Sequence, residues 1–241
     1  MPQQIPCAFI NPVSAMSKSK MVKFAELKTF PNVLRNTDFK NPILVDYRQQ
    51  PRNLRGVWSR EFFQNPHPIV LELACGKGDY TLALARLYPN KNIIGIDLKG
   101  NRLWSGAKKA LQLQLHNAAF IRSRIELLPH FFGENEVSEI WITFPDPYPK
   151  ASKANKRLTS EFFIEKYRAF CKKGALVHLK TDDPDLFEFS VRVASRLGTV
   201  EQVMENVYAT EQVPEVLRIQ TYYERMHLQQ GRTIRYLRFA L

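Results

Sequence analysis

An aspartate framed by prolines is the first candidate for chemistry in this chain. Residues 143–150 read TFPDPYPK, so Asp146 has a proline on each side. The stretch directly follows an apolar segment at residues 139–144, which predicts a buried strand. Because proline fixes its own φ and biases the residue before it to an extended backbone, we expect an extended Phe144 and a carboxylate with little freedom. The pattern favours a binding or catalytic acid; a solvated acid in a proline-rich turn is the alternative.

A second candidate site follows an earlier apolar segment. LELACGKGDY contains Glu72, Gly76 and Gly78, and glycines before a helix let the backbone approach a ligand closely. A dinucleotide fingerprint would need a third glycine where Thr81 stands. Asp97, which ends the next apolar segment, can accept both hydroxyls of a ribose. Glu72 would repel a pyrophosphate but not a cationic cofactor with an amino-acid end. The set therefore favours S-adenosylmethionine over a nicotinamide dinucleotide, with ordinary strand-end charges as the alternative.

The elements that must position these residues alternate along the chain. Apolar segments predict strands at residues 69–74, 92–97, 118–122, 139–144 and 175–181. Helical spacing predicts helices at residues 79–88, 100–116, 160–173 and 183–198, with Asp79 and Ser160 at helix starts and Gly174 and Gly198 at helix ends. This alternation is typical of a doubly wound α/β sheet, in which ligands bind at the carboxyl ends of the strands.

The charge of the chain indicates a nucleic-acid partner. Lys and Arg number 35 against 23 Asp and Glu, which gives a net charge of +12 and a pI near 9.7. The excess is uneven, since residues 1–60 carry ten basic and three acidic residues. A solubilising surface charge is the alternative interpretation.

Three parts are predicted along the 241 residues. Residues 1–20 show no periodicity and several helix or strand breakers, which predicts a flexible basic tail. Residues 21–67 form an arm rich in Pro, Asn and Arg, whose aromatic residues we expect to pack on the main domain at residues 68–241. The sequence leaves open whether Met1 or Met21 is the functional start.

No metal site and no membrane segment is predicted. Cys7, Cys75 and Cys171 lack the paired spacing of a zinc site, which indicates a reducing compartment. The chain has neither a long apolar run nor the apolar core of a signal peptide, so we expect a cytoplasmic protein without a membrane partner. The histidines lack catalytic or metal-binding spacing and are expected in the core or on the surface: His67, His116, His130, His178 and His227.

The motifs resemble those of a known family, the tRNA (guanine-N7-)-methyltransferases, which methylate a guanine of the tRNA variable loop with S-adenosylmethionine. FPDPYPK, followed by ASKANKRLTSEFF, is similar to the family's F-P-D-P-W-P-K-K signature and its basic run. HLKTDD near residue 180 and TYYE near residue 221 follow in the family's order. The resemblance covers about residues 21–240. It implies a Rossmann-like methyltransferase sheet, mostly parallel with an antiparallel C-terminal strand.

The resemblance also implies roles for single residues. The cofactor site would comprise Glu72, Gly76, Gly78, Asp97, Arg124 and Asp146, with Asp146 as the catalytic acid facing cofactor and target base. The substrate guanine would contact Lys150, Asp182, Thr221, Tyr222, Tyr223 and Glu224. The RNA backbone would contact Lys153, Lys156 and Arg157. By the same resemblance the target is position 46 of tRNA, no obligatory protein partner is expected, and the chain is a monomer or a homodimer.

The chain departs from the family's pattern at three positions. Ala74 stands where the family often has the first glycine, which should stiffen the loop without blocking it. Tyr148 replaces the usual tryptophan and keeps an aromatic face. Arg124 takes the place of the Asp or Asn near the adenine, which would shift adenine recognition to backbone groups.

The implied reaction needs alignment more than proton transfer. Guanine N7 carries an in-plane lone pair, so its attack on a sulfonium methyl requires no base. Asp146 would stabilise the positive charge of the methylated purine, bind the methionine amino group or bind the guanine edge; the sequence does not separate these roles. Asp182 would accept from the guanine N1–H and N2–H₂ donors. We expect the base to be turned out of the tRNA core.

Phosphate binding is expected from basic residues on both sides of these motifs. Besides the run after the proline loop, the arm and tail contribute Lys18, Lys20, Lys23 and Lys28. Because each neutralised phosphate releases counterions, binding to tRNA should depend strongly on salt.

Three other functions fit these motifs less well. An adenine-N6 methyltransferase has a similar D-P-P-aromatic loop, but its aromatic residue comes one place later and the downstream blocks have no role there. The intact acids Glu72, Asp97 and Asp146 argue against a non-catalytic RNA-binding protein with the same fold, whereas Ala74 and Arg124 leave that alternative open. A nicotinamide-dependent oxidoreductase conflicts with Thr81 and Glu72.

Overall fold

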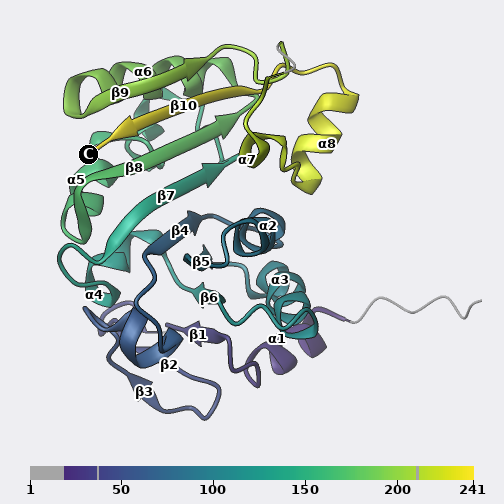
Figure 1. The fold of residues 1–241 in the computed structure, drawn as a ribbon, viewed down its shortest axis with the longest axis vertical. Helices are drawn as coiled ribbons and strands as arrows, with labels where there is room; N and C mark the ends of the chain where they lie inside the picture. The colour runs from purple at the N-terminus through teal and green to yellow at the C-terminus, as the bar shows by residue number, and fades with distance from the viewer. Residues whose placement is uncertain (1–18, 37, 210–211) are drawn as a thin grey trace, which may run out of the picture.

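The computed structural model describes residues 19–36, 38–209 and 212–241. The predicted tail lies almost entirely outside the described residues, as do Cys7 and Lys18. Figure 1 shows one continuous sheet with helices on both of its faces. Its strand order is β3-β2-β1-β6-β5-β4-β7-β8-β10-β9.

The centre of the sheet is parallel, as the strand–helix alternation predicts. β4 (Ile69–Leu73), β5 (Asn92–Asp97), β6 (Ala118–Arg122), β7 (Val137–Thr143) and β8 (Cys171–Thr181) run in one direction. The last strand, β10 (Arg235–Ala240), is antiparallel to β8, and β9 (Thr199–Met204) is antiparallel to β10. The fold class and the antiparallel C-terminal strand are therefore confirmed.

The connecting helices begin close to the predicted residues. They are α2 (Asp79–Leu87), α3 (Gly100–Gln112), α5 (Glu161–Arg168) and α6 (Pro184–Leu197). The remaining short helices are η2 (Ile125–Leu127), α4 (Leu128–Phe131), η3 (Ala151–Lys156), α7 (Glu215–Arg218) and α8 (Tyr222–Gln229). The arrowhead of β8 points toward α7 and α8 (Figure 1).

Two helix ends are predicted wrongly. The helix expected at residues 100–116 ends at Gln112, and the helix expected at residues 160–173 ends at Arg168, with β8 already beginning at Cys171. Gly174, expected to end the helix, lies inside β8 with a φ of 75°. Its amide donates to the carbonyl of Leu241, so the chain end pairs with the start of β8. This long-range pairing decides the boundary, and the local helical spacing cannot report it.

The N-terminal arm extends the sheet as well as packing on it. β1 (Val33–Arg35) pairs in parallel with β6, and β2 (Leu44–Val45) and β3 (Pro51–Arg52) continue the sheet antiparallel. α1 (Lys20–Leu27) packs on α3. The aromatic residues act as anchors: η1 (Trp58–Phe63), a short π-helix, buries Trp58, whose indole donates to the carbonyl of Phe131 at 2.8 Å.

Two hydrophobic cores cover the two faces of the sheet. On one face Leu71 belongs to a cluster that includes Phe163 of α5. On the other, Val70 belongs to a cluster that includes Tyr80 of α2 and Leu103 of α3. Neighbouring residues of β4 thus point to opposite faces, as the pleat requires. No helix within the described part of the chain is long and apolar enough to span a bilayer.

Candidate functional site

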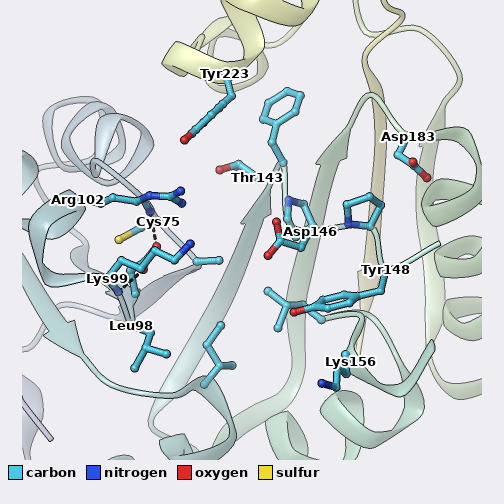
Figure 2. A pocket seen from close by; sticks show the side chains of 18 of the residues that line it. Cys75, Leu98, Lys99, Arg102, Thr143, Asp146, Tyr148, Lys156, Asp183 and Tyr223 are labelled. Carbon is cyan, nitrogen blue, oxygen red and sulfur yellow. Dashed lines mark hydrogen bonds between the residues drawn. The ribbon is translucent and has the colours of Figure 1, made fainter. Parts of the chain in front are cut away.

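A cavity of about 980 Å³ opens at the carboxyl ends of the parallel strands. The residues that directly follow β4, β5, β6, β7 and β8 all contribute to its lining, together with parts of η3 and α8. Figure 2 shows Lys99 and Arg102 on one side, Asp146 and Tyr148 on the other, and Tyr223 reaching in from α8. The volume lies at the upper end for small-molecule sites, so it suits a cofactor together with part of a substrate.

The loop after β4 forms one wall of the cavity. Gly76 lines it at a φ of 56°, and its amide donates to Asp97 Oδ2 at 2.9 Å. The other Asp97 oxygen accepts from the amide of Lys99 at 2.7 Å. Ala74 also has a φ of 56°, which costs a residue with a Cβ about 1 kcal/mol. The Asp97 carboxylate is thus fixed at the cavity while each oxygen keeps a second lone pair for a ligand.

Gly78 has a packing role behind this wall. Its φ is 74°, and a Cβ built on it would lie 2.7 Å from Cε1 of Phe120. It is not among the residues that line the cavity. Its value to the site is the close packing of the start of α2 against β6.

Glu72 lies behind the loop rather than in the cavity. Its side chain is 1% exposed, and the Thr81 amide donates to Oε2 at 2.7 Å. The Thr81 hydroxyl also donates to Oε2, and the Thr143 hydroxyl donates to Oε1 at 3.0 Å. Glu72 therefore links the start of α2 to the residue before the proline loop. Its predicted contact with the cofactor stays a prediction.

Burial raises the pKa of Glu72 from 4.5 to about 7, against the lowering effect of its three hydrogen bonds. The carboxyl group is ionised in the unfolded chain above about pH 4.5, but in the native protein only above about pH 7. The native state therefore binds the extra proton between these values, and its stability falls as the pH rises through them.

The Glu72→Gln substitution should remove this pH dependence. Relative to wild type, the variant should gain about 3 kcal/mol of unfolding free energy between pH 4.5 and pH 8, since one pKa unit corresponds to about 1.4 kcal/mol. Urea unfolding of both proteins across this range measures the difference. Glu188→Gln, which alters an exposed carboxylate on α6, should show no such trend. Parallel pH profiles for wild type and Glu72→Gln would contradict the prediction.

The proline loop holds Asp146 at the cavity, but not in the predicted way. Phe144 has a φ of 50° and Tyr148 a φ of 45°, so the expected extended backbone at Phe144 is wrong. The Phe144 amide donates to the carbonyl of Lys180 at 2.9 Å, and its ring packs edge-on against His227 at 5.6 Å. These contacts offset the strain of a positive φ. Asp146 itself is exposed and lines the cavity, as predicted.

Arg157 braces this loop and is not on its surface. Its side chain donates to the carbonyls of Pro147 and Tyr148 at 3.0 and 3.2 Å and stacks on Phe189 at 4.5 Å. Only 7% of the residue is exposed. The structure therefore does not place Arg157 for the RNA contact that the basic run predicts, because its donors are used inside the protein.

Asp182 lines the cavity but already has basic side chains beside it. Arg232 lies 2.6 Å from Oδ2, and Nδ1 of His227 lies 3.0 Å from Oδ1. Both side chains also line the cavity. The expectation that every histidine is a core or surface residue therefore misses His227. A usable signal was its helical spacing from Tyr223, since residues four apart share a helix face.

Three residues of the TYYE segment line the cavity, and the fourth, Glu224, is enclosed by the protein. Thr221 caps α8 by accepting from the amide of Glu224 at 3.1 Å. Glu224 is fully buried and lies 2.7 Å from the Lys180 ammonium. Tyr222 and Tyr223 line the cavity, with Lys77 over the Tyr222 ring at 4.2 Å. Glu224 is thus removed from the guanine contact that the resemblance implies, because its carboxylate is enclosed by the protein.

A buried hydroxyl was missed next to Arg124. Ser123 directly follows β6, lines the cavity and is 1% exposed. Its Oγ has no hydrogen-bond partner among the described residues. Arg124 lines the cavity too, but it is exposed and stacks on Phe39 at 4.3 Å. The position right after a strand end was the signal that favoured Ser123 over Arg124.

Basic side chains surround the cavity. None of them has a carboxylate partner within the described ranges: Lys77, Lys99, Arg102, Arg124, Lys153 and Lys156. The first three were not predicted as site residues. The same lining also holds six carboxylates, those of Asp79, Asp97, Glu126, Asp146, Asp182 and Asp183, so it combines groups for an anionic phosphate with groups for a cationic or hydrogen-bond-donating ligand.

The structure brings most of the predicted site residues together. Those lining the cavity are Gly76, Asp97, Arg124, Asp146, Lys153, Lys156, Asp182, Thr221, Tyr222 and Tyr223. Those outside its lining are Glu72, Gly78, Lys150, Arg157 and Glu224. In the described part of the chain no group of three or more His, Cys, Asp or Glu could hold a metal ion.

Comparisons with known proteins point to one enzyme class. The family described as "Putative methyltransferase" matches residues 66–237. A tRNA (guanine-N(7)-)-methyltransferase of Bacteroides thetaiotaomicron is 44% identical over 228 residues, which cover 94% of this chain and 87% of that protein.

Solved structures show the same fold at lower identity. The 16S rRNA methyltransferase KamB superposes with a TM-score of 0.57 at 14% identity, over 80% of this chain and 96% of that one. A 16S rRNA (adenine(1408)-N(1))-methyltransferase from Catenulisporales acidiphilia, solved with its cosubstrate SAM, gives a TM-score of 0.51 at 14% identity, over 79% and 93% of the chains.

Proposed function

This chain belongs to the tRNA (guanine-N(7)-)-methyltransferase family, and from that premise we propose that it methylates N7 of guanine 46 in the variable loop of tRNA. It is an S-adenosylmethionine-dependent methyltransferase that acts on a guanine N7 of tRNA. The observation that supports the activity is one cavity that joins the glycine loop, Asp146 and basic side chains without carboxylate partners among the described residues, whereas position 46 follows from the family resemblance. We place the reaction in the cytoplasm, where tRNA is available.

The residues present fit the cofactor. Asp97 offers its free lone pairs to the ribose hydroxyls, and the backbone at Gly76 leaves open space for close approach. The unpartnered hydroxyl of Ser123 supplies a buried polar atom for the adenine. Ser123 thereby takes the role that the resemblance gave to Arg124. Glu72 supports this site by holding the loop and Thr143 in place.

Ser123→Ala should weaken cofactor binding about fivefold, the loss expected for one hydrogen bond. The folded protein should lose no stability, because in its free form Ser123 Oγ has no partner among the described residues. Calorimetry with S-adenosylhomocysteine measures the affinity and thermal unfolding the stability. Arg124→Ala is the matched control and should change the affinity less than twofold. The reverse ranking of the two variants would contradict the assignment to Ser123.

The residues of the chain act by alignment and charge. When bound, S-adenosylmethionine supplies an electrophilic methyl group, and the guanine N7 lone pair attacks it without loss of a proton. Asp146 is an exposed acid on the proline loop and lines the cavity that we assign to both reactants. We assign to it the stabilisation of the positive charge that develops on the purine ring. The loop needs its bracing by Arg157, because electrostatic stabilisation depends on a fixed distance.

The guanine subsite lies between Asp182 and the tyrosines of α8. Asp182 is held by Arg232, whose guanidinium donates to Oδ2 at 2.6 Å, and its Oδ1 lies 3.0 Å from the imidazole of His227. We assign its free lone pairs to the N1–H and N2–H₂ donors of guanine. Tyr222 and Tyr223 offer aromatic faces to a base turned out of the tRNA core. The basic residues around the cavity contact the flanking phosphates.

Transfer of a labelled methyl group to unmodified tRNA tests the function. Label from S-adenosylmethionine should appear at guanine 46, in a form cleaved under conditions specific for N7-methylguanine. A tRNA with adenine at position 46 is the control and should take up no label. Incorporation at another base or another position would overturn the proposed assignment.

A further inference from the structure

Lys180 links the proline loop, which carries Asp146, to the segment that leads into α8. It lies near the end of β8, where its carbonyl accepts from the amide of Phe144, two residues before Asp146. Its side chain is fully buried and points to the segment that leads into α8. One residue thus contacts the loop that carries the acid and the segment that carries the tyrosines.

The ammonium group of Lys180 has a complete set of acceptors. It donates to the carbonyls of Leu217 and Ile219 at 2.9 and 3.1 Å. It donates to Glu224 Oε2 at 2.9 Å and lies 2.7 Å from Oε1. A lysine ammonium has three protons, so no donor is left for a ligand.

Glu224 is equally committed to the protein interior. Its Oε1 also accepts from the hydroxyl of Tyr208 at 2.7 Å, and its amide donates to Thr221. Both side chains of the ion pair are 0% exposed. Compared with apolar residues of similar size, a buried ion pair contributes little net stability. A role in positioning the neighbouring residues therefore explains the pair better than a role in stability.

The start of α8 is also docked on the cofactor loop. The amide of Tyr222 donates to Asp79 Oδ2 at 3.1 Å, and Lys77 lies over the Tyr222 ring. Tyr223 reaches toward the cavity from α8, above Asp146 in the view of Figure 2. The tyrosines are therefore held by two sets of contacts, one to Asp79 and Lys77 and one through Glu224 and Lys180, and the second set leads to the loop of Asp146.

We propose that Lys180 and Glu224 are positioning residues, which hold Tyr222 and Tyr223 at the distance from Asp146 that the target base requires. This inference rests on the proposed function, because it assigns Tyr223 to the guanine side of that site. It differs from the role that the TYYE motif implies for Glu224, a direct contact with the substrate. The pair acts on the substrate only through the tyrosines.

A mutant cycle tests this dependence. The Lys180→Met/Glu224→Met double variant removes both charges together, so no charge stays buried without a partner. It should raise KM for tRNA about 10-fold while the affinity for S-adenosylhomocysteine stays within about twofold. Tyr223→Ala should raise KM about 10-fold in the wild type but less than about twofold in the double variant, because the tyrosine is already misplaced there.

Two further variants separate lost positioning from misfolding and from a general loss of stability. Glu224→Gln keeps the shape of the side chain and should raise KM for tRNA about threefold even if the double variant does not fold. Lys91→Met breaks a partly buried ion pair with Glu139, 2.6 Å long, just before β5. It should lower the melting temperature without changing KM for tRNA, which separates lost stability from lost positioning.

These measurements test the positioning role and the proposed function separately. The positioning role is overturned if Tyr223→Ala raises KM for tRNA by the same factor in the wild type and in the double variant, or if Glu224→Gln leaves KM for tRNA unchanged. The proposed function would stand in either case. If the wild-type protein methylates no tRNA guanine, the proposed function itself fails.

Discussion

Asp146→Asn is expected to lower the turnover of methyl transfer at least about 100-fold, the usual cost of losing a charge aimed at the transition state. Asparagine keeps the size of the side chain and removes its negative charge. The rigid loop should stay in place, because it is braced by Arg157 and by the amide of Phe144. Affinity for S-adenosylhomocysteine should change less than about threefold, since Asp97 and Ser123 lie elsewhere in the cavity.

Single-turnover methyl transfer and calorimetry measure these two quantities. Asp185→Asn, which alters an exposed carboxylate in the first turn of α6, is the matched control and should keep the wild-type rate. Turnover at the wild-type rate by Asp146→Asn would contradict the charge-stabilising role of Asp146. A parallel loss of cofactor affinity would instead assign Asp146 to the methionine amino group.

Lys153→Glu/Lys156→Glu should weaken tRNA binding about 30-fold at moderate salt. Both lysines belong to η3, are exposed, line the cavity and have no carboxylate partner among the described residues. Each phosphate contact releases condensed counterions, so the slope of log affinity against log salt should fall by about two. Turnover at saturating tRNA should stay close to wild type, because neither lysine is assigned to the reacting atoms.

Filter binding across a salt series measures the affinity and its slope. Lys172→Glu/Lys173→Glu is the matched control, since both residues are exposed at the start of β8, at the strand end opposite the cavity. It makes the same change in net charge away from the proposed RNA path. If both double variants lose affinity equally, the effect belongs to overall charge and the proposed path over η3 is wrong.

The strain at the site has a structural cause that the sequence conceals. Phe144 precedes a proline, and local rules give it an extended backbone. Its actual φ of 50° depends on the carbonyl of Lys180 and the ring of His227, which come from β8 and α8. Two partners distant in the chain thus decide the conformation of a residue next to Asp146.

Burial has a similar effect on the roles of single residues. Glu72, Arg157 and Glu224 carry charges that a sequence presents as available to a ligand. In the structure each is turned inward, onto Thr81 and Thr143, onto the proline loop, or onto Lys180. Ser123 and His227 show the converse, since each has only a positional signal in the sequence, the end of a strand or a shared helix face, and its place at the cavity is set by the fold.

The strand pattern and the edge at which the site forms are predictable from the amino-acid sequence. Apolar periodicity marks the central strands, and the glycine loop, Asp97 and Asp146 each follow or end a strand, so the rule that ligands bind at carboxyl ends places them together. The folded structure sets which of the neighbouring charges face the cavity and which brace it. A strand end limits a side chain to one region of space, but the direction of the side chain depends on partners supplied by distant segments such as β8 and α8.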